Sequence, residues 1–194
     1  INRNGSLRRE LGIEGSDIIV ATVGRLSKEK GMEDFIEAAA IALKKNRNIT
    51  YLIIGEGPEE RVLQKIVNNN GLGNRIKFLG YRNDMESIYP EIDILVLASY
   101  TEGLPKVIIE GLAYERPVIA TSVGGVPEVI IDNETGILIQ PRAPEMLAKE
   151  IELLIYNENR RKHLGRNGKI LIEKDFNLKT RTEKLEEIYE NIRR

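Results

Sequence analysis

The sequence contains no cysteine and no tryptophan, and its only histidine is His163. Without cysteine, disulfides and thiolate metal sites are excluded, and a single histidine argues against a histidine-based zinc site. The formal net charge of −1 argues against a general affinity for nucleic acid. No apolar run approaches the roughly eighteen residues that would span a bilayer. These absences favour an ordinary globular protein that needs no bound metal.

The chain is rich in both charged and hydrophobic residues, at 30% and 41% of its 194 residues. Such a composition is typical of a folded domain, so we predict one domain over residues 1–194 and a cytoplasmic location. Association with a membrane surface stays open. Because the first residue is Ile1 rather than Met, we expect the chain to be part of a longer protein.

Short apolar runs alternate with amphipathic stretches along most of the chain. The near-continuous Ile/Val/Leu runs predict buried parallel strands at 18–23, 50–54, 76–79, 94–98, 118–120 and 137–139. Helical patterns occupy 32–45, 59–70, 84–89, 105–114, 126–130, 145–156, 159–174 and 178–192. This order predicts an α/β fold, a doubly wound, Rossmann-like parallel sheet of six strands with a helical C-terminal tail.

In such folds ligands bind beyond the carboxyl ends of the strands, so the loops there are the candidate site. The loop after the first strand runs from Gly24 to Gly31 and contains Arg25 and Lys30. These two cations could converge on a diphosphate, while Gly24 lets the backbone approach closely. A merely solvated loop is the alternative.

The stretch from Thr101 to Glu110 follows the fourth predicted strand and contains two glutamates, Glu102 and Glu110. A helix that begins at Pro105 would offer free N–H groups to phosphate, and Pro105 suits the first helical position. The carboxylates would then accept hydrogen bonds from sugar hydroxyls. Structural alternatives are that Glu102 complements the helix dipole and that Glu110 pairs with Lys106.

Three other motifs favour structural interpretations. Gly55-Glu56-Gly57 lacks the third glycine of a dinucleotide fingerprint and indicates a tight turn. Gly124-Gly125 indicates a loop that needs positive φ. The basic run at 160–166, which includes His163, is flanked by acidic residues and indicates a solvated helix face.

Taken in order, these motifs resemble the carboxy-terminal domain of family-four retaining glycosyltransferases with the GT-B fold. The resemblance covers nearly the whole chain, through the segments at 23–31, 54–58, 78–81, 102–110, 123–128 and 134–139. Departures from the common pattern are Gly111 after the second glutamate and Glu115-Arg116-Pro117 before the fifth strand. None of them removes a motif residue.

The resemblance implies a nucleotide-sugar donor site. Arg25 and Lys30 would bind the donor diphosphate, Glu102 would contact the transferred sugar, and Glu110 would hold the ribose. Backbone groups would complete the site, at Gly24, Gly103, Leu104, Pro105, Lys106 and Val107. The Lys106 side chain would also reach the phosphates or the substrate, and the loop at Tyr81 would contact the base.

The same resemblance implies transfer of a hexose from a UDP, GDP or ADP carrier to an acceptor hydroxyl, with retention and without metal or other cofactor. The acceptor, a glycan, a lipid or a small molecule, would bind a separate N-terminal domain that these residues do not include. We therefore expect the chain alone to be inactive in transfer. The alternatives are a GT-B sugar-nucleotide epimerase or phosphorylase, and a non-catalytic nucleotide-binding or interaction module.

Overall fold

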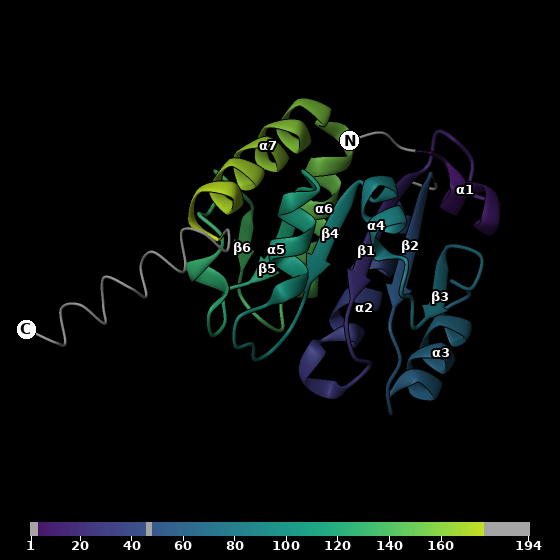
Figure 1. The fold of residues 1–194 in the computed structure, drawn as a ribbon. Helices are drawn as coiled ribbons and strands as arrows, with labels where there is room; N and C mark the ends of the chain where they lie inside the picture. The colour runs from purple at the N-terminus through teal and green to yellow at the C-terminus, as the bar shows by residue number, and fades with distance from the viewer. Residues whose placement is uncertain (1–3, 46–47, 177–194) are drawn as a thin grey trace, which may run out of the picture.

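The computed structural model describes residues 4–45 and 48–176, which form one parallel sheet with helices on both faces (Figure 1). The strands are β1 (Ile18–Val23), β2 (Ile49–Ile54), β3 (Ile76–Gly80), β4 (Ile94–Leu97), β5 (Val118–Thr121) and β6 (Ile137–Ile139). All six predicted strands are confirmed, each within one residue of its expected ends. The α/β fold class predicted from the alternation is therefore correct.

The helices are α1 (Ser6–Leu11), α2 (Met32–Leu43), α3 (Glu60–Asn69), α4 (Met85–Ile88), α5 (Lys106–Ala113), α6 (Pro144–Tyr156) and α7 (Glu158–Asp175), with short 3-10 turns η1 (Lys28–Lys30), η2 (Tyr89–Glu91) and η3 (Val126–Glu128). Neither α1 nor η1 was expected from the sequence. The helix expected at 126–130 is only the turn η3, because the N–H of Ile131 donates to Thr135 Oγ1 and leaves the helical path. The helix expected at 178–192 lies outside the described residues.

The sheet has the strand order β3-β2-β1-β4-β5-β6. The chain builds outward from β1 to β3 and then crosses back to β4, on the other side of β1. The loops after β1 and β4 therefore diverge at this switch point, where doubly wound folds leave a crevice for a ligand.

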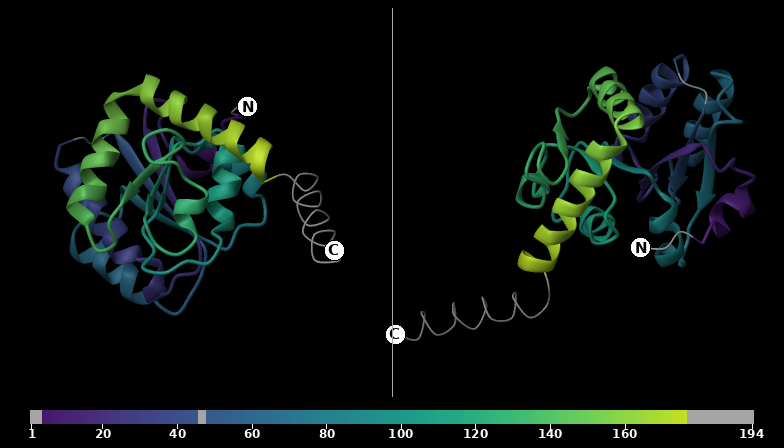
Figure 2. Two further views of the ribbon diagram at one scale, coloured as in Figure 1. Left: turned by 90° about the vertical axis from the view of Figure 1, so that its left-hand side faces the viewer. Right: turned by 90° about the horizontal axis from the view of Figure 1, so that it is seen from above.

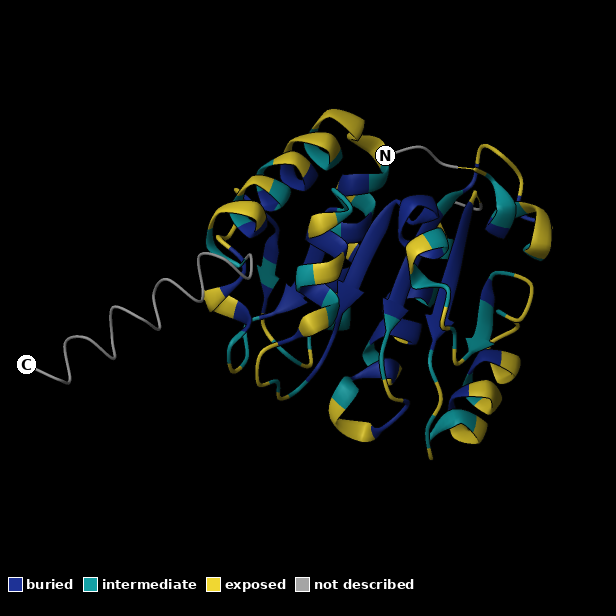
Figure 3. Ribbon diagram, viewed as in Figure 1, coloured by how far each residue is buried: buried dark blue, intermediate teal, exposed yellow. Residues whose placement is uncertain are grey.

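Helices lie on both faces of the sheet (Figure 2), and two hydrophobic layers pack them against it. One layer packs α2, α3 and α6 against side chains such as Val20, and the other packs α1, α4 and α5 against Ile19 and Ala21. Adjacent residues of one strand thus point to opposite layers, as the pleat requires. Figure 3 shows the central strands buried, β3 mostly at intermediate exposure, and the exposed residues on the outer faces of the helices. With both faces covered, only the two sheet edges and the loops there remain open for binding.

Candidate functional site

The loop after β1 is held against its neighbours by backbone contacts. The N–H of Gly24 donates to Ile54 O at 2.9 Å, and the N–H of Leu26 donates to Glu56 O at 2.9 Å. The loop ends at Gly31, with φ 61°, where a Cβ would lie 1.9 Å from Ala98 O at the end of β4. Only glycine allows this approach, which places Lys30 beside the loop that follows β4.

Lys30 and Glu102, two residues of the predicted site, form an ion pair. Lys30 Nζ lies 2.7 Å from Glu102 Oε1, and the Glu102 side chain is 9% exposed. Ser99 Oγ donates to the same Oε1 at 2.6 Å, and Ser99 is fully buried. The sequence interpretation did not single out Ser99, although a hydroxyl three residues before a motif glutamate was a usable signal.

Arg25 and Lys106 also lie beyond the carboxyl ends of the strands, at the carboxyl edge of the sheet, and are exposed. Within the residues that the structure describes, neither side chain has a hydrogen bond or an ion pair. The Lys106–Glu110 pair considered from the sequence is therefore absent. Two cations at the switch point thus remain available to an anionic ligand, in addition to Lys30.

Glu110 is held instead by a tyrosine. Tyr89 OH donates to Glu110 Oε2 at 2.7 Å, and the Tyr89 ring stacks on Tyr114 with centroids 5.3 Å apart. Burial, helped by the nearby Glu110 carboxylate, raises the pKa of the Tyr89 phenol above its usual range, so Tyr89 stays a hydrogen-bond donor. No sequence pattern indicated this pair, because η2 and α5 are brought together only by folding.

The amino end of α5 opens toward the same edge. The helix begins at Lys106, and Pro105 is its cap residue with φ −78° and ψ 96°, so its expected place as first helical residue is wrong by one position. Among the described residues, the N–H groups of Lys106 and Val107 have no acceptor. Free N–H groups and a helix dipole at this point favour an anion.

Residues Gly103 and Leu104 precede this helix and are exposed. Gly124 and Gly125 pack against them: the N–H of Gly125 donates to Gly103 O at 3.1 Å, and a Cβ on Gly124 would lie 1.8 Å from Glu102 O. Gly124 has φ 51°, which confirms the positive φ predicted for this loop. The glycine pair therefore supports the backbone that carries Glu102.

Tyr81 follows β3 and is 73% exposed. Its N–H donates to Glu56 Oε1 at 3.3 Å. Because β2 and β1 separate β3 from β4, Tyr81 lies further along the same sheet edge and is not brought against Glu102. Gly55 makes the close packing here possible, since a Cβ on it would lie 2.0 Å from Gly24 O.

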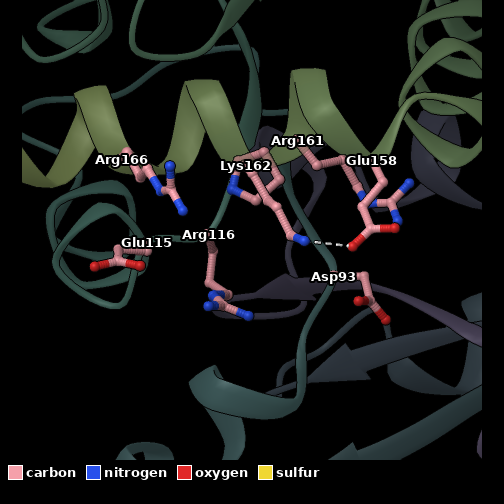
Figure 4. A pocket seen from close by; sticks show the side chains of 8 residues that line it. Asp93, Glu115, Arg116, Glu158, Arg161, Lys162 and Arg166 are labelled. Carbon is pink, nitrogen blue, oxygen red and sulfur yellow. Dashed lines mark ion pairs between the residues drawn. The ribbon is translucent and has the colours of Figure 1, made fainter. Parts of the chain in front are cut away.

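The amino ends of the strands form the amino edge of the sheet, and a cleft of about 380 Å³ lies there. Figure 4 shows it between α7 and the segments before β4 and β5. Three of its four cations already have partners, and Arg166 has none within the described residues. Arg116 donates to Pro90 O and Ile92 O, Arg161 donates to two carbonyls of α6, and Lys162 pairs with Glu158 at 2.7 Å. The predicted structural role of the basic run at 160–166 is thereby supported.

In residues 4–45 and 48–176, no group of three or more His, Asp or Glu side chains is arranged to hold a metal ion. Of the helices described, none combines the length and the apolar composition needed to cross a bilayer.

Comparison with known proteins identifies the family. The family model described as glycosyl transferases group 1 matches residues 4–170. The chain belongs to this family. An alpha-D-kanosaminyltransferase from Streptomyces kanamyceticus is 33% identical over 193 residues, covering 98% of the chain and 50% of the relative. The chain thus spans about half the length of the curated relatives it matches.

Solved structures of the glycosyl transferase group share the fold. The C-terminal domain of a group 1 protein, LpcC of Francisella tularensis, superposes with TM-score 0.82 at 32% identity and covers 91% of this chain and 94% of that one. Anabaena Alr3699/HepE in complex with UDP superposes with TM-score 0.89 at 26% identity and covers 96% and 52%. The same Anabaena protein was also solved with UDP-glucose. The predicted resemblance is confirmed for glycosyl transferases group 1 and for the fold of their C-terminal domain.

Proposed function

We propose that this chain is the donor-binding domain of a GT-B glycosyltransferase and that a nucleotide-sugar binds at the carboxyl edge of its sheet. The observation that carries the proposal is the cluster at the switch point, where Lys30 and Ser99 hold Glu102 while Arg25 stays unpaired within the described residues. The nucleotide complexes of the Anabaena neighbour support it, because UDP and UDP-glucose bind a protein of the same fold.

Each group at the edge has a role in the proposal. Arg25, Lys30 and the start of α5 stabilise the diphosphate and the charge that develops on it as the leaving group departs. The backbone around them, at Gly24, Gly103, Leu104, Pro105, Lys106 and Val107, lines the phosphates and the sugar. Glu102 accepts from hydroxyls of the transferred sugar, Glu110 accepts from the ribose, and Tyr81 lies beside the base.

We extend the proposal to the reaction itself. The longer protein transfers a hexose to an acceptor hydroxyl with retention of configuration, and no metal takes part, because fixed cations and helix N–H groups supply the charge stabilisation. The acceptor, a glycan, a lipid or a small molecule, binds a second domain that pairs with this edge. The isolated chain then binds the donor and transfers nothing.

Calorimetric titration of the chain with UDP, GDP and ADP, and with their sugar conjugates, tests donor binding. We expect one nucleotide to bind and Arg25→Ala to weaken it about 10- to 100-fold, as for a lost charge-assisted contact of about 1.5–3 kcal/mol. Arg61→Ala, which removes an exposed arginine from α3, is the matched control and should leave the affinity unchanged. Equal affinities of Arg25→Ala and wild type would contradict the assignment.

Transfer requires a separate assay. Sugar transfer by the longer protein, lost in Glu102→Ala, would support the enzymatic proposal. Nucleotide binding without transfer by the longer protein would favour a non-catalytic nucleotide-binding module. Detectable transfer by this chain alone would contradict the need for a second domain.

A further inference from the structure

Both glutamates of the carboxyl edge are held by a buried hydroxyl through one oxygen only. Ser99 Oγ donates to Glu102 Oε1 at 2.6 Å, and Tyr89 OH donates to Glu110 Oε2 at 2.7 Å. Ser99 is 0% exposed and Tyr89 is 1% exposed. Each hydroxyl is therefore fixed by the core, whereas each carboxylate reaches the edge of the sheet.

The contacts of Glu102 leave one oxygen for a ligand. A carboxylate oxygen has about two lone-pair positions, and Oε1 already accepts from both Lys30 and Ser99. No donor in the described part of the chain reaches Oε2. Ser99 is itself fixed, because Thr121 Oγ1 on β5 donates to the Ser99 carbonyl oxygen at 2.5 Å. The direction of the second oxygen is thus set by residues at the carboxyl ends of two strands, β4 and β5.

Glu110 has the same arrangement with a different donor. Its Oε2 accepts from Tyr89, and Oε1 has no donor among residues 4–45 and 48–176. The Tyr89 ring cannot turn away, because it is buried in the core and stacked on Tyr114. Without this hydrogen bond, the exposed Glu110 side chain would lose rotamer freedom when a ligand binds. The contact with Tyr89 restricts the side chain beforehand and so lowers that entropy cost.

We propose that Ser99 and Tyr89 are positioning residues that each direct the free oxygen of one glutamate to a different part of the ligand. Ser99 acts through Glu102 on the transferred sugar, and Tyr89 acts through Glu110 on the ribose. The inference rests on the proposed donor site and adds residues outside its ligand contacts. Each substitution should therefore weaken the binding of one part of the ligand and spare the other part.

The test compares three ligands within each variant: the nucleoside diphosphate that wild type selects, its sugar conjugate and its 2′,3′-dideoxy analogue. We expect Ser99→Ala to bind the nucleoside diphosphate with wild-type affinity. The ratio of its affinity for the sugar conjugate to its affinity for the nucleoside diphosphate should fall about tenfold below the wild-type ratio. We expect Tyr89→Phe to bind the dideoxy analogue with wild-type affinity. The ratio of its affinity for the nucleoside diphosphate to its affinity for the dideoxy analogue should fall about tenfold below the wild-type ratio. Calorimetry on the 194-residue chain supplies all the constants.

Two controls and the pattern of losses separate positioning from a structural role. Ser87→Ala and Tyr156→Phe remove hydroxyls from α4 and α6 and should change none of the affinities. Because each result is a ratio between ligands on one variant, a loss of stability cancels. Equal weakening of all three ligands by either variant would overturn the inference, as would no weakening at all.

Failure of the inference is distinguishable from failure of the proposed function. If wild type binds a nucleotide-sugar but the losses do not follow the ligand's hydroxyls, only the positioning roles are wrong. If wild type binds none of the nucleotides, the donor site is wrong and the positioning roles are overturned with it.

Discussion

The two edges of the sheet use their charged residues differently. At the amino edge, Arg8 contacts the buried carboxylates of Glu91 at 3.4 Å and Asp93 at 3.2 Å, and Arg116 donates to backbone carbonyls. At the carboxyl edge, Glu102 and Glu110 each receive donors on one oxygen only within the described residues. At the amino edge most charged groups stabilise the fold, whereas at the carboxyl edge part of the charged groups can bind a ligand.

This difference identifies the site better than the size of a hollow does. Three of the four cations that line the amino-edge cleft of about 380 Å³ already have partners. Within the described residues, the carboxyl edge has two unpaired cations, free helix N–H groups and two carboxylates with one oxygen unoccupied, where the sheet order leaves its switch point. The binding site is therefore identified by polar groups that the fold holds in place and that have hydrogen-bonding or charge-pairing capacity left for a ligand.

The largest effect on stability is expected from Arg8→Met at the amino edge. The substitution leaves the carboxylate of Glu91, which is 1% exposed, without its cation. Loss of one partner of a buried pair costs about 3–5 kcal/mol of the free energy of unfolding. Urea unfolding measures this loss, and Arg9→Met, at the exposed neighbouring arginine, is the control. A nucleotide affinity of the folded variant that falls together with stability would show that the two edges are not independent.

Gly124→Ala should damage the carboxyl edge itself. The left-handed φ of 51° disfavours alanine, and the added Cβ would lie 1.8 Å from Glu102 O. The backbone strain alone costs about 1–3 kcal/mol, and the clash displaces the segment that carries Glu102. Thermal unfolding and nucleotide titration should both show a loss. Gly15→Ala, where a Cβ meets nothing within 4 Å, should show neither.

Lys30→Ala should separate binding from stability. The pair with Glu102 is partly exposed, with the Lys30 side chain 25% exposed, so its removal should change the free energy of unfolding by less than about 1 kcal/mol. The affinity for a nucleoside diphosphate should fall about tenfold or more, because a charge-assisted contact is lost. If the free energy of unfolding fell while the nucleotide affinity stayed unchanged, Lys30 would have a structural role like the charged residues of the amino edge.

The smallest effect concerns pH and the pair of Glu115 with Lys169, 3.0 Å apart between α5 and α7. The hydrogen bond from Lys169 lowers the pKa of Glu115 from 4.5, so the stability it contributes is present above pH 4.5 and is lost as pH falls through the lowered pKa. The bond to Glu115 raises the pKa of Lys169 from 10.5, so that contribution is lost as pH rises through the raised pKa. Solvent screening keeps both to a few tenths of a kcal/mol.

Lys169→Met removes this contribution, so its melting temperature should lie slightly below that of wild type between pH 4.5 and pH 10.5 and approach the wild-type value outside that range. Lys149→Met, at an exposed lysine of α6, should leave the pH profile unchanged. An unaltered acid limb in Lys169→Met would mean that the pair does not fasten α7.

Local sequence was sufficient where the structure depends on nearest neighbours. Most strands were predicted because they are apolar runs covered on both faces, as at β2, where every residue is buried. Helix α1 was not predicted, since only Leu7 of its residues is buried and Arg8 is held by Glu91 and Asp93, more than eighty residues away. The roles of Ser99 and Tyr89 were missed because their contacts depend on where a buried side chain points.

The sequence by itself determined the strand–helix alternation, the family and the residue types at the carboxyl ends of the strands, because these follow from periodicity and from motifs a few residues long. Only the tertiary structure decided which oxygen of each glutamate is occupied and which is left for a ligand. That choice depends on the strand order, which brings β1 and β4 together, and on buried hydroxyls whose orientation is set by packing.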